Sequence, residues 1–139
     1  MKKNNPSKRV IYLVFSIVSL FVGLACYLIF NHEADISDLM LNIFHFPKIN
    51  VEKNIITEII RGYGADFLWM FSFTFFIQAI LELRTKWWLF LCILLGIVYE
   101  ITQAIGIAKG TADWLDVIAY SFGCVFAILI IFILGGNEG

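Results

Sequence analysis

The sequence predicts an all-α fold, a four-helix transmembrane bundle with one or two interfacial helices in the first outer loop. The chain of 139 residues is 60% hydrophobic and 15% charged, whereas soluble domains average about 45–50% apolar and about 25% charged residues. Its apolar residues form four runs, each close to the ~20 residues that a helix needs to cross a bilayer. These predicted spans are 10–30, 65–83, 87–107 and 114–134. We therefore expect a single integral membrane domain over residues 1–139, with amphipathic helices in the outer loop 31–64.

The first run, 10–30, contains no charged residue and follows a basic N-terminal segment. A secretory signal peptide has the same polarity, but its apolar region is usually about 7–15 residues long, so a retained helix is favoured. The segment that ends at Cys26 also resembles a lipoprotein cleavage box. Gly23 stands where that box usually has Leu, and the apolar run continues beyond Cys26 to Phe30. We therefore predict an uncleaved first span.

The outer loop 31–64 contains two apolar patterns with helical spacing. The first pattern consists of Ile36, Leu39, Met40, Ile43 and Phe44, and the second of Ile55, Ile56, Ile59 and Ile60. Gly62-Tyr63-Gly64 is expected to break the helix before the second span. Helices of this kind lie in the membrane interface or cap a bundle. Packing is the favoured role, because an apolar helical face is more often packing than a ligand site.

Basic residues predict that both termini are cytoplasmic, because Lys and Arg favour the cytoplasmic side of a membrane. Six of them precede the first span or lie between the second and third, namely Lys2, Lys3, Lys8, Arg9, Arg84 and Lys86. Four fall on the other side, namely Lys48, Lys53, Arg61 and Lys109. The inverted orientation stays an alternative. Tryptophans near the predicted span ends fit an aromatic belt, and these are Trp69, Trp87, Trp88 and Trp114.

Composition also limits the partners. A net charge of −1 offers no basic surface for nucleic acid, so membrane lipids are the expected partners and nucleic acid is not. A homo-oligomer is compatible with this composition. The three cysteines all lie in apolar runs, where they are expected to act as small hydrophobic residues. The sequence contains no Cys-x-x-Cys pair, the spacing that would suggest a structural metal.

The candidate site consists of polar residues inside or beside the predicted spans. Ionisable groups at membrane depth are costly and raise a functional hypothesis by default. With the predicted topology, the second, third and fourth spans bring such groups to one outer-leaflet pocket. The candidate ligand-binding residues are Asp66, Glu100, Gln103, Lys109, Asp113, Asp116 and Tyr120. Glu100 and Gln103 share a helix face, and so do Asp113 and Asp116, because each pair is spaced i, i+3.

Structural roles compete with binding at several of these positions. Asp113 and Asp66 stand where a helix cap or a dipole-stabilised acid is expected. Lys109 or Arg61 would serve as an ion partner for an acid in a purely structural cluster. Glu100 lies well inside its helix, which favours a functional role or a specific buried pair. The sequence identifies no catalytic residue and no cofactor, although clustered carboxylates suggest a divalent cation as a candidate.

The same residues carry a family resemblance. Glu100 and Gln103, then Asp113 and Asp116, then Gly123 resemble the pattern of the VanZ-like family of bacterial membrane proteins. That pattern runs Glu-x-x-Gln, a short turn with a basic residue, Asp-x-x-Asp, and later a glycine. The resemblance covers the third and fourth spans strongly and the second weakly, through Asp66. It departs at Lys109, which stands in place of the usual Arg, and at Tyr120, which stands in place of the usual Asn. An earlier basic residue and the His that commonly follows the acid of the second span are also absent, and Phe67 and Met70 stand near there.

The resemblance implies a multi-span protein of the bacterial cytoplasmic (inner) membrane that acts in the cell envelope. One branch of the family is linked to resistance to the glycopeptide teicoplanin, which implies a lipid-linked envelope precursor or a glycopeptide as the ligand of the acidic pocket. Two alternatives remain open. In the first, the protein is a membrane enzyme that acts on a lipid phosphate or ester. In the second, it is a structural membrane protein whose polar cluster only fixes helix register.

Overall fold

The structure is a computed structural model that describes residues 6–30, 43, 54–81, 87–108 and 112–135. Nearly all of these described residues are helical and none of them forms a strand, which confirms the predicted all-α class. The elements are α1 (Pro6–Phe30), α3 (Ile55–Ile59), the π-helical turn η1 (Ile60–Gly64), α4 (Ala65–Leu81), α5 (Trp87–Ala104) and α6 (Trp114–Gly135).

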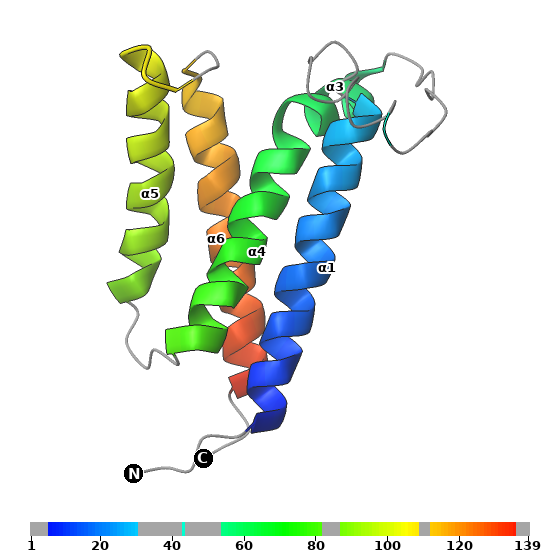
Figure 1. Ribbon diagram of the computed structural model, residues 1–139, viewed down its shortest axis with the longest axis vertical. Helices are drawn as coiled ribbons and strands as arrows, with labels where there is room; N and C mark the ends of the chain where they lie inside the picture. The colour runs from blue at the N-terminus through cyan, green and yellow to red at the C-terminus, as the bar shows by residue number, and fades with distance from the viewer. Residues whose placement is uncertain (1–5, 31–42, 44–53, 82–86, 109–111, 136–139) are drawn as a thin grey trace.

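The long helices α1, α4, α5 and α6 run side by side and alternate in direction (Figure 1). α1 begins and α6 ends at the same end of the molecule. The opposite end carries α3, the end of α1, the end of α5 and the beginning of α6 (Figure 1). We call this second end the α3 end. It is the end toward which the predicted acidic residues converge.

Three helical stretches are long and apolar enough to cross a membrane, namely Pro6–Ile29, Ile55–Leu81 and Trp114–Leu134. A shorter apolar stretch, Leu91–Ala104, belongs to α5. Many large apolar side chains on these helices are exposed in the isolated chain, including Phe21, Phe122 and Ile133 at 63–75%. In water such a surface would be unfavourable, whereas in a bilayer it contacts lipid, so the helices are those of a membrane protein.

The third predicted span, 87–107, extends too far at its end. α5 stops at Ala104, and Gly106 follows with a φ of 75°. The amides of Ile107 and Ala108 turn back to donate to the carbonyl oxygen of Thr102, at 2.8 and 3.0 Å. This is how a left-handed glycine closes a helix, because it satisfies carbonyls of the last turn that the helix itself leaves free.

The expected helix break at Gly62-Tyr63-Gly64 is wrong. Ile55–Leu81 is continuous, with the π-helical turn η1 joining α3 to α4. A continuous helix bonds its own backbone groups, whereas a break near the bilayer would leave them without water to bond to. α3 begins at Asn54, whose side chain and that of Thr57 form a capping box. Of the first amphipathic segment, only Ile43 is among the described residues, and it is helical and exposed.

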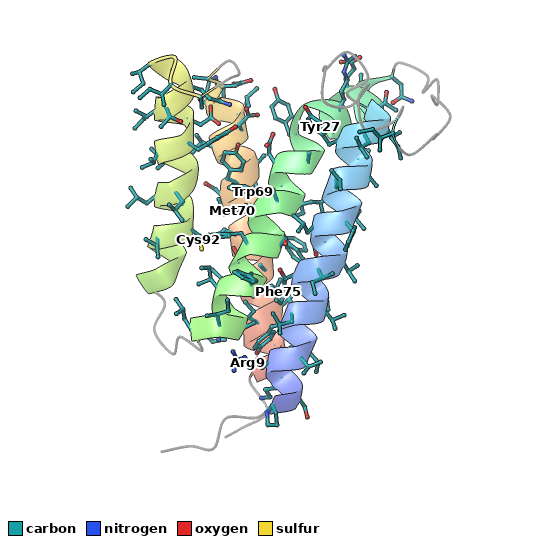
Figure 2. All side chains as sticks on the ribbon, viewed as in Figure 1. Arg9, Tyr27, Trp69, Met70, Phe75 and Cys92 are labelled. Carbon is teal, nitrogen blue, oxygen red and sulfur yellow. The ribbon has the colours of Figure 1, made fainter. Side chains whose placement is uncertain are left out.

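α4 is the central helix, because it packs along both α1 and α6. Met70, Phe75 and Ala79 on α4 are at most 1% exposed, and Figure 2 shows Met70 and Phe75 between the helices. Against α6 the two backbones meet at Gly123, where a methyl group would overlap the carbonyl oxygen of Phe67. Such close approach at a small residue is typical of helix pairs in membranes.

Candidate functional site

Three helices each bring an acid to the α3 end. Asp66 lies in the first turn of α4, Glu100 near the end of α5, and Asp116 in the first turn of α6. They are close enough for Asp116 to interact electrostatically with the other two and with Asp113, which precedes α6. The structure therefore brings together four of the predicted site residues. It does so because α4 and α6 begin, and α5 ends, at the same end of the molecule.

Tyr120 links two of these acids from the second turn of α6. Its hydroxyl lies 3.3 Å from Oδ1 of Asp66 and 3.4 Å from Oε1 of Glu100. The tyrosine is only 3% exposed. Its ring fits against Gly96 of α5, where an added Cβ would lie 2.9 Å from the ring. Tyr120 is therefore the residue through which α4, α5 and α6 meet.

Glu100 also accepts a hydrogen bond from the backbone just before α6. The backbone amide of Asp113 donates to Oε2 of Glu100 at 2.9 Å, and Glu100 is 7% exposed. A carboxylate at this position is favoured by the partial positive charge of a helix N-terminus. The structure thus supplies the specific buried partner that the sequence predicted as one explanation of this acid.

Asp113 has the geometry of a helix cap. Its Oδ1 accepts from the amide of Leu115 at 2.9 Å, and its carbonyl oxygen accepts from the amide of Asp116 at 3.1 Å. Tyr63 of η1 lies close enough to Asp113 to interact electrostatically with its carboxylate. Sequence reasoning missed Tyr63, which it assigned only to a helix break, and no local signal points from Tyr63 to Asp113.

The remaining predicted residues are less closely involved. Gln103 lies one turn beyond Glu100 and is partly buried, and its carbonyl oxygen accepts from the amide of Gly106 in the turn that ends α5. Lys109 lies outside the described residues. Within the described ranges there is no group of three or more His, Cys, Asp or Glu side chains arranged to hold a metal ion. The described residues therefore offer the divalent-cation hypothesis no group of three ligands.

A cavity of about 450 Å³ opens beside these polar groups. All four long helices contribute to it, and most of its walls are apolar or aromatic. The lining residues are Leu20, Gly23, Leu24, Tyr27, Ala65, Asp66, Trp69, Tyr99 and Tyr120. Figure 2 shows Tyr27 and Trp69 in the half of the molecule nearer the α3 end. We call this cavity the aromatic pocket.

Sequence reasoning anticipated only Asp66 and Tyr120 of the pocket lining. The sequence predicts Trp69 only as part of an aromatic belt. In the structure its ring also stands edge-on to that of Tyr120, with ring centroids 6.1 Å apart. Tyr27 and Tyr99 carry no sequence signal beyond their place near the ends of predicted spans. Glu100, Asp113 and Asp116 are not among the lining residues, and Glu100 meets the pocket through its hydrogen bond with Tyr120.

A second and larger cavity, of about 790 Å³, lies along α3 and η1. Its lining includes the exposed side chains of Ile55, Glu58 and Ile59. None of the predicted ligand-binding residues lines it, although Arg61 and Tyr63 do.

The chain was compared with protein families, curated proteins and solved structures. No family model, no curated protein and no solved structure matches it. The VanZ-like resemblance therefore stays a prediction that rests on the residues of the third and fourth predicted spans.

Proposed function

We propose that this chain is a VanZ-like, four-span protein of the bacterial inner membrane that binds a lipid-linked ligand of the cell envelope in the aromatic pocket. One observation carries the proposal. A cavity of about 450 Å³ combines apolar walls with a carboxylate and a buried tyrosine hydroxyl at the α3 end. Pockets of about 300–1,000 Å³ with apolar walls and a few placed polar groups are typical of small-molecule sites.

The fourth span in this proposal is α5. Its 18 residues, Trp87–Ala104, extend about 27 Å at a rise of 1.5 Å per residue. That length is close to the ~30 Å hydrocarbon core of a bilayer. α5 also lies alongside α6 and runs antiparallel to it (Figure 1). Glu100 is the one charged residue of α5, and it accepts hydrogen bonds from the amide of Asp113 and the hydroxyl of Tyr120.

The proposed orientation follows from the distribution of Lys and Arg. With both termini cytoplasmic, the α3 end and the aromatic pocket face the outside of the cell membrane. Fusion of a reporter enzyme that is active only outside the cytoplasm tests this. The reporter should be inactive at the C-terminus and active when inserted after Asn54. The opposite pattern would mean that the pocket faces the cytoplasm.

The dimensions of the pocket favour a membrane amphiphile over a whole glycopeptide. Leu20 and Leu24 of α1 line the cavity and are 49% and 48% exposed, so an apolar chain in the pocket can continue into the surrounding lipid. The polar end of the same molecule would reach Asp66 and Tyr120. The family-like acids Glu100, Asp113 and Asp116 then hold Tyr120 and α6 in place and do not contact the ligand.

The test measures thermal unfolding of the full chain in neutral maltoside micelles with added polyprenyl phosphate, phosphatidylglycerol or phosphatidylethanolamine, so that anionic and ammonium headgroups are both represented. A ligand of the native state stabilises it by about 2.7 kcal/mol at one hundred times its dissociation constant. We expect at least one lipid to stabilise the wild type. Leu24→Trp, which fills the cavity, should lose this stabilisation, whereas Glu58→Gln on α3 should keep it.

Two results would contradict the proposal. One is the absence of a shift with every lipid, and the other is an equal shift in wild type and Leu24→Trp. Sensitivity to teicoplanin of cells that express each variant at equal membrane levels tests the envelope role. Wild type and Glu58→Gln should lower sensitivity more than Leu24→Trp does. If Asp66→Asn only lowers stability and leaves lipid binding unchanged, the polar cluster is structural.

A further inference from the structure

We propose that the ligand of the aromatic pocket carries an ammonium group, held by the carboxylate of Asp66 and by the faces of the surrounding aromatic rings. This inference rests on the proposed function, because it takes the pocket to be a site for a membrane amphiphile. It adds the chemical class of the headgroup. The argument has three parts, which concern the charge of the lining, its aromatic side chains and its apolar side.

The charge of the lining favours a cation. Among the described residues that line the pocket, Asp66 is the one acid, and none is Lys, Arg or His. The Tyr120 hydroxyl reaches Oδ1 of Asp66, which leaves Oδ2, with respect to the described residues, for a ligand. Glu100 and Asp116 stand behind Asp66 within electrostatic range. An anionic headgroup would enter against these acids, since like charges at short range in a partly desolvated site repel strongly.

The aromatic side chains come from all four long helices. They are Tyr27 of α1, Trp69 of α4, Tyr99 of α5 and Tyr120 of α6. Trp69 and Tyr120 meet edge to face at an interplanar angle of 64°, and Trp69 also stacks on Phe73. The face of an aromatic ring attracts a cation, most strongly in Trp, and aromatic cages of this kind recognise quaternary ammonium ligands. A neutral headgroup gains nothing from this arrangement beyond apolar contact.

The apolar side of the pocket accommodates the chain of the same molecule. Leu20, Gly23 and Leu24 occupy one side of α1 beside Ala65. Gly23 lets α1 approach α4 closely at this point, since an added Cβ would lie 3.2 Å from Cβ of Leu68, and the two leucines lead outward to the lipid. The ammonium group would therefore lie at the level of Asp66, near the membrane surface, with its alkyl chain directed into the bilayer.

The experiment compares three probes with the same chain, namely decyltrimethylammonium, decyl sulfate and decyl maltoside, with the full protein in neutral maltoside micelles. Binding is measured as the concentration dependence of thermal stabilisation. We expect decyltrimethylammonium to bind at least tenfold more tightly than decyl sulfate. Asp66→Asn should weaken its binding about tenfold, and Glu58→Gln, the matched exposed acid on α3, should leave it unchanged.

The aromatic contribution has its own pair of variants. Trp69→Leu should weaken decyltrimethylammonium binding several-fold, and Trp69→Phe should restore most of it because a ring face remains. Phe76→Leu is the control, since Phe76 lies on the same helix and has the same 42% exposure as Trp69 but does not line the pocket. Unfolding without ligand identifies any variant that fails to fold.

The outcomes separate the two proposals. If decyl sulfate or decyl maltoside binds as tightly as the ammonium probe and Leu24→Trp abolishes that binding, the ammonium inference is wrong and the amphiphile pocket stands. Ammonium binding that is equal in Asp66→Asn, Trp69→Leu and wild type would also overturn the inference. If no probe and no lipid stabilises the wild type, both proposals fail.

Discussion

The contact between α4 and α6 differs in kind from the contact between α5 and α6. α4 and α6 approach until their backbones touch at Gly123. α5 meets α6 through side chains instead. Glu100 accepts from the amide of Asp113, Tyr120 lies against Gly96, and Cys92 and Cys124 are both fully buried in the core.

The difference shows how helices are held together where water is absent. Lipid chains are as apolar as the helices, so burial of apolar surface does little to drive association, and close packing and hydrogen bonds take over. α1, α4 and α6 form the closely packed part, with α4 at its centre. α5 has few contacts with α4 and depends more on the polar groups of the α3 end. The candidate site and the attachment of α5 therefore share residues.

The largest expected effect is that of Gly123→Ala. The added methyl group would overlap the carbonyl oxygen of Phe67, a backbone atom that moves only if the helices separate. Overpacking of this kind typically lowers the free energy of unfolding by 1–3 kcal/mol, and we expect a value of about 3 kcal/mol. Unfolding in mixed detergent micelles measures it.

Gly62→Ala is the matched control for this change, because nothing lies within 4 Å of a Cβ at Gly62. In a helix, alanine is favoured over glycine by roughly 0.5–1 kcal/mol, so this variant should be neutral or more stable. Equal destabilisation by the two substitutions would mean that α4 and α6 do not meet at Gly123.

A smaller loss is expected for Glu100→Ala. It leaves the amide of Asp113 without its acceptor and leaves the hydroxyl of Tyr120 with Asp66 alone. An unsatisfied buried donor typically costs about 1–3 kcal/mol, and we expect a loss of about 2 kcal/mol. Faster hydrogen exchange should appear at the beginning of α6, while exchange in α1 and α4 stays slow.

Glu100→Gln keeps an acceptor oxygen and should lose less than half as much stability as Glu100→Ala. If the two variants were equally unstable, the charge of Glu100 and not its hydrogen bonds would hold α5 to α6. If neither variant changed exchange at the beginning of α6, the polar attachment of α5 would be refuted.

The smallest effect is expected where α1 packs against α4. Ser72 donates to the carbonyl oxygen of Ser16 at 2.7 Å, and the two hydroxyls lie 3.2 Å apart. Hydrogen bonds between membrane helices average about 0.6 kcal/mol, so Ser72→Ala should lower stability by about that amount. Ser121→Ala should change it less, because Ser121 bonds only within its own helix, to Val117. A loss of stability above 2 kcal/mol in Ser72→Ala would mean that this hydrogen bond is the main attachment of α1 to α4.

Much of the fold could be predicted along the chain. Apolar runs of membrane length located α1, α4, α5 and α6, because hydropathy depends on residues that are adjacent in sequence. The error at the end of α5 came from a turn at Gly106 that interrupts an apolar run without changing its hydropathy. The error at Gly62 and Gly64 came from treating glycine as a helix breaker, whereas the membrane favours a continuous helix that bonds its own backbone.

The candidate site could also be predicted only in part from the sequence. Composition and spacing were enough to establish a helical membrane protein and to direct attention to Asp66, Glu100 and Asp116, since an acid in an apolar run is visible in the sequence. How the helices pack decides that Tyr120 bridges two of these acids, that Tyr63 lies close to Asp113, and that four aromatic residues from four helices enclose one cavity. Those contacts join residues far apart in the chain, and their geometry depends on the rotation and separation of whole helices, which no local pattern encodes.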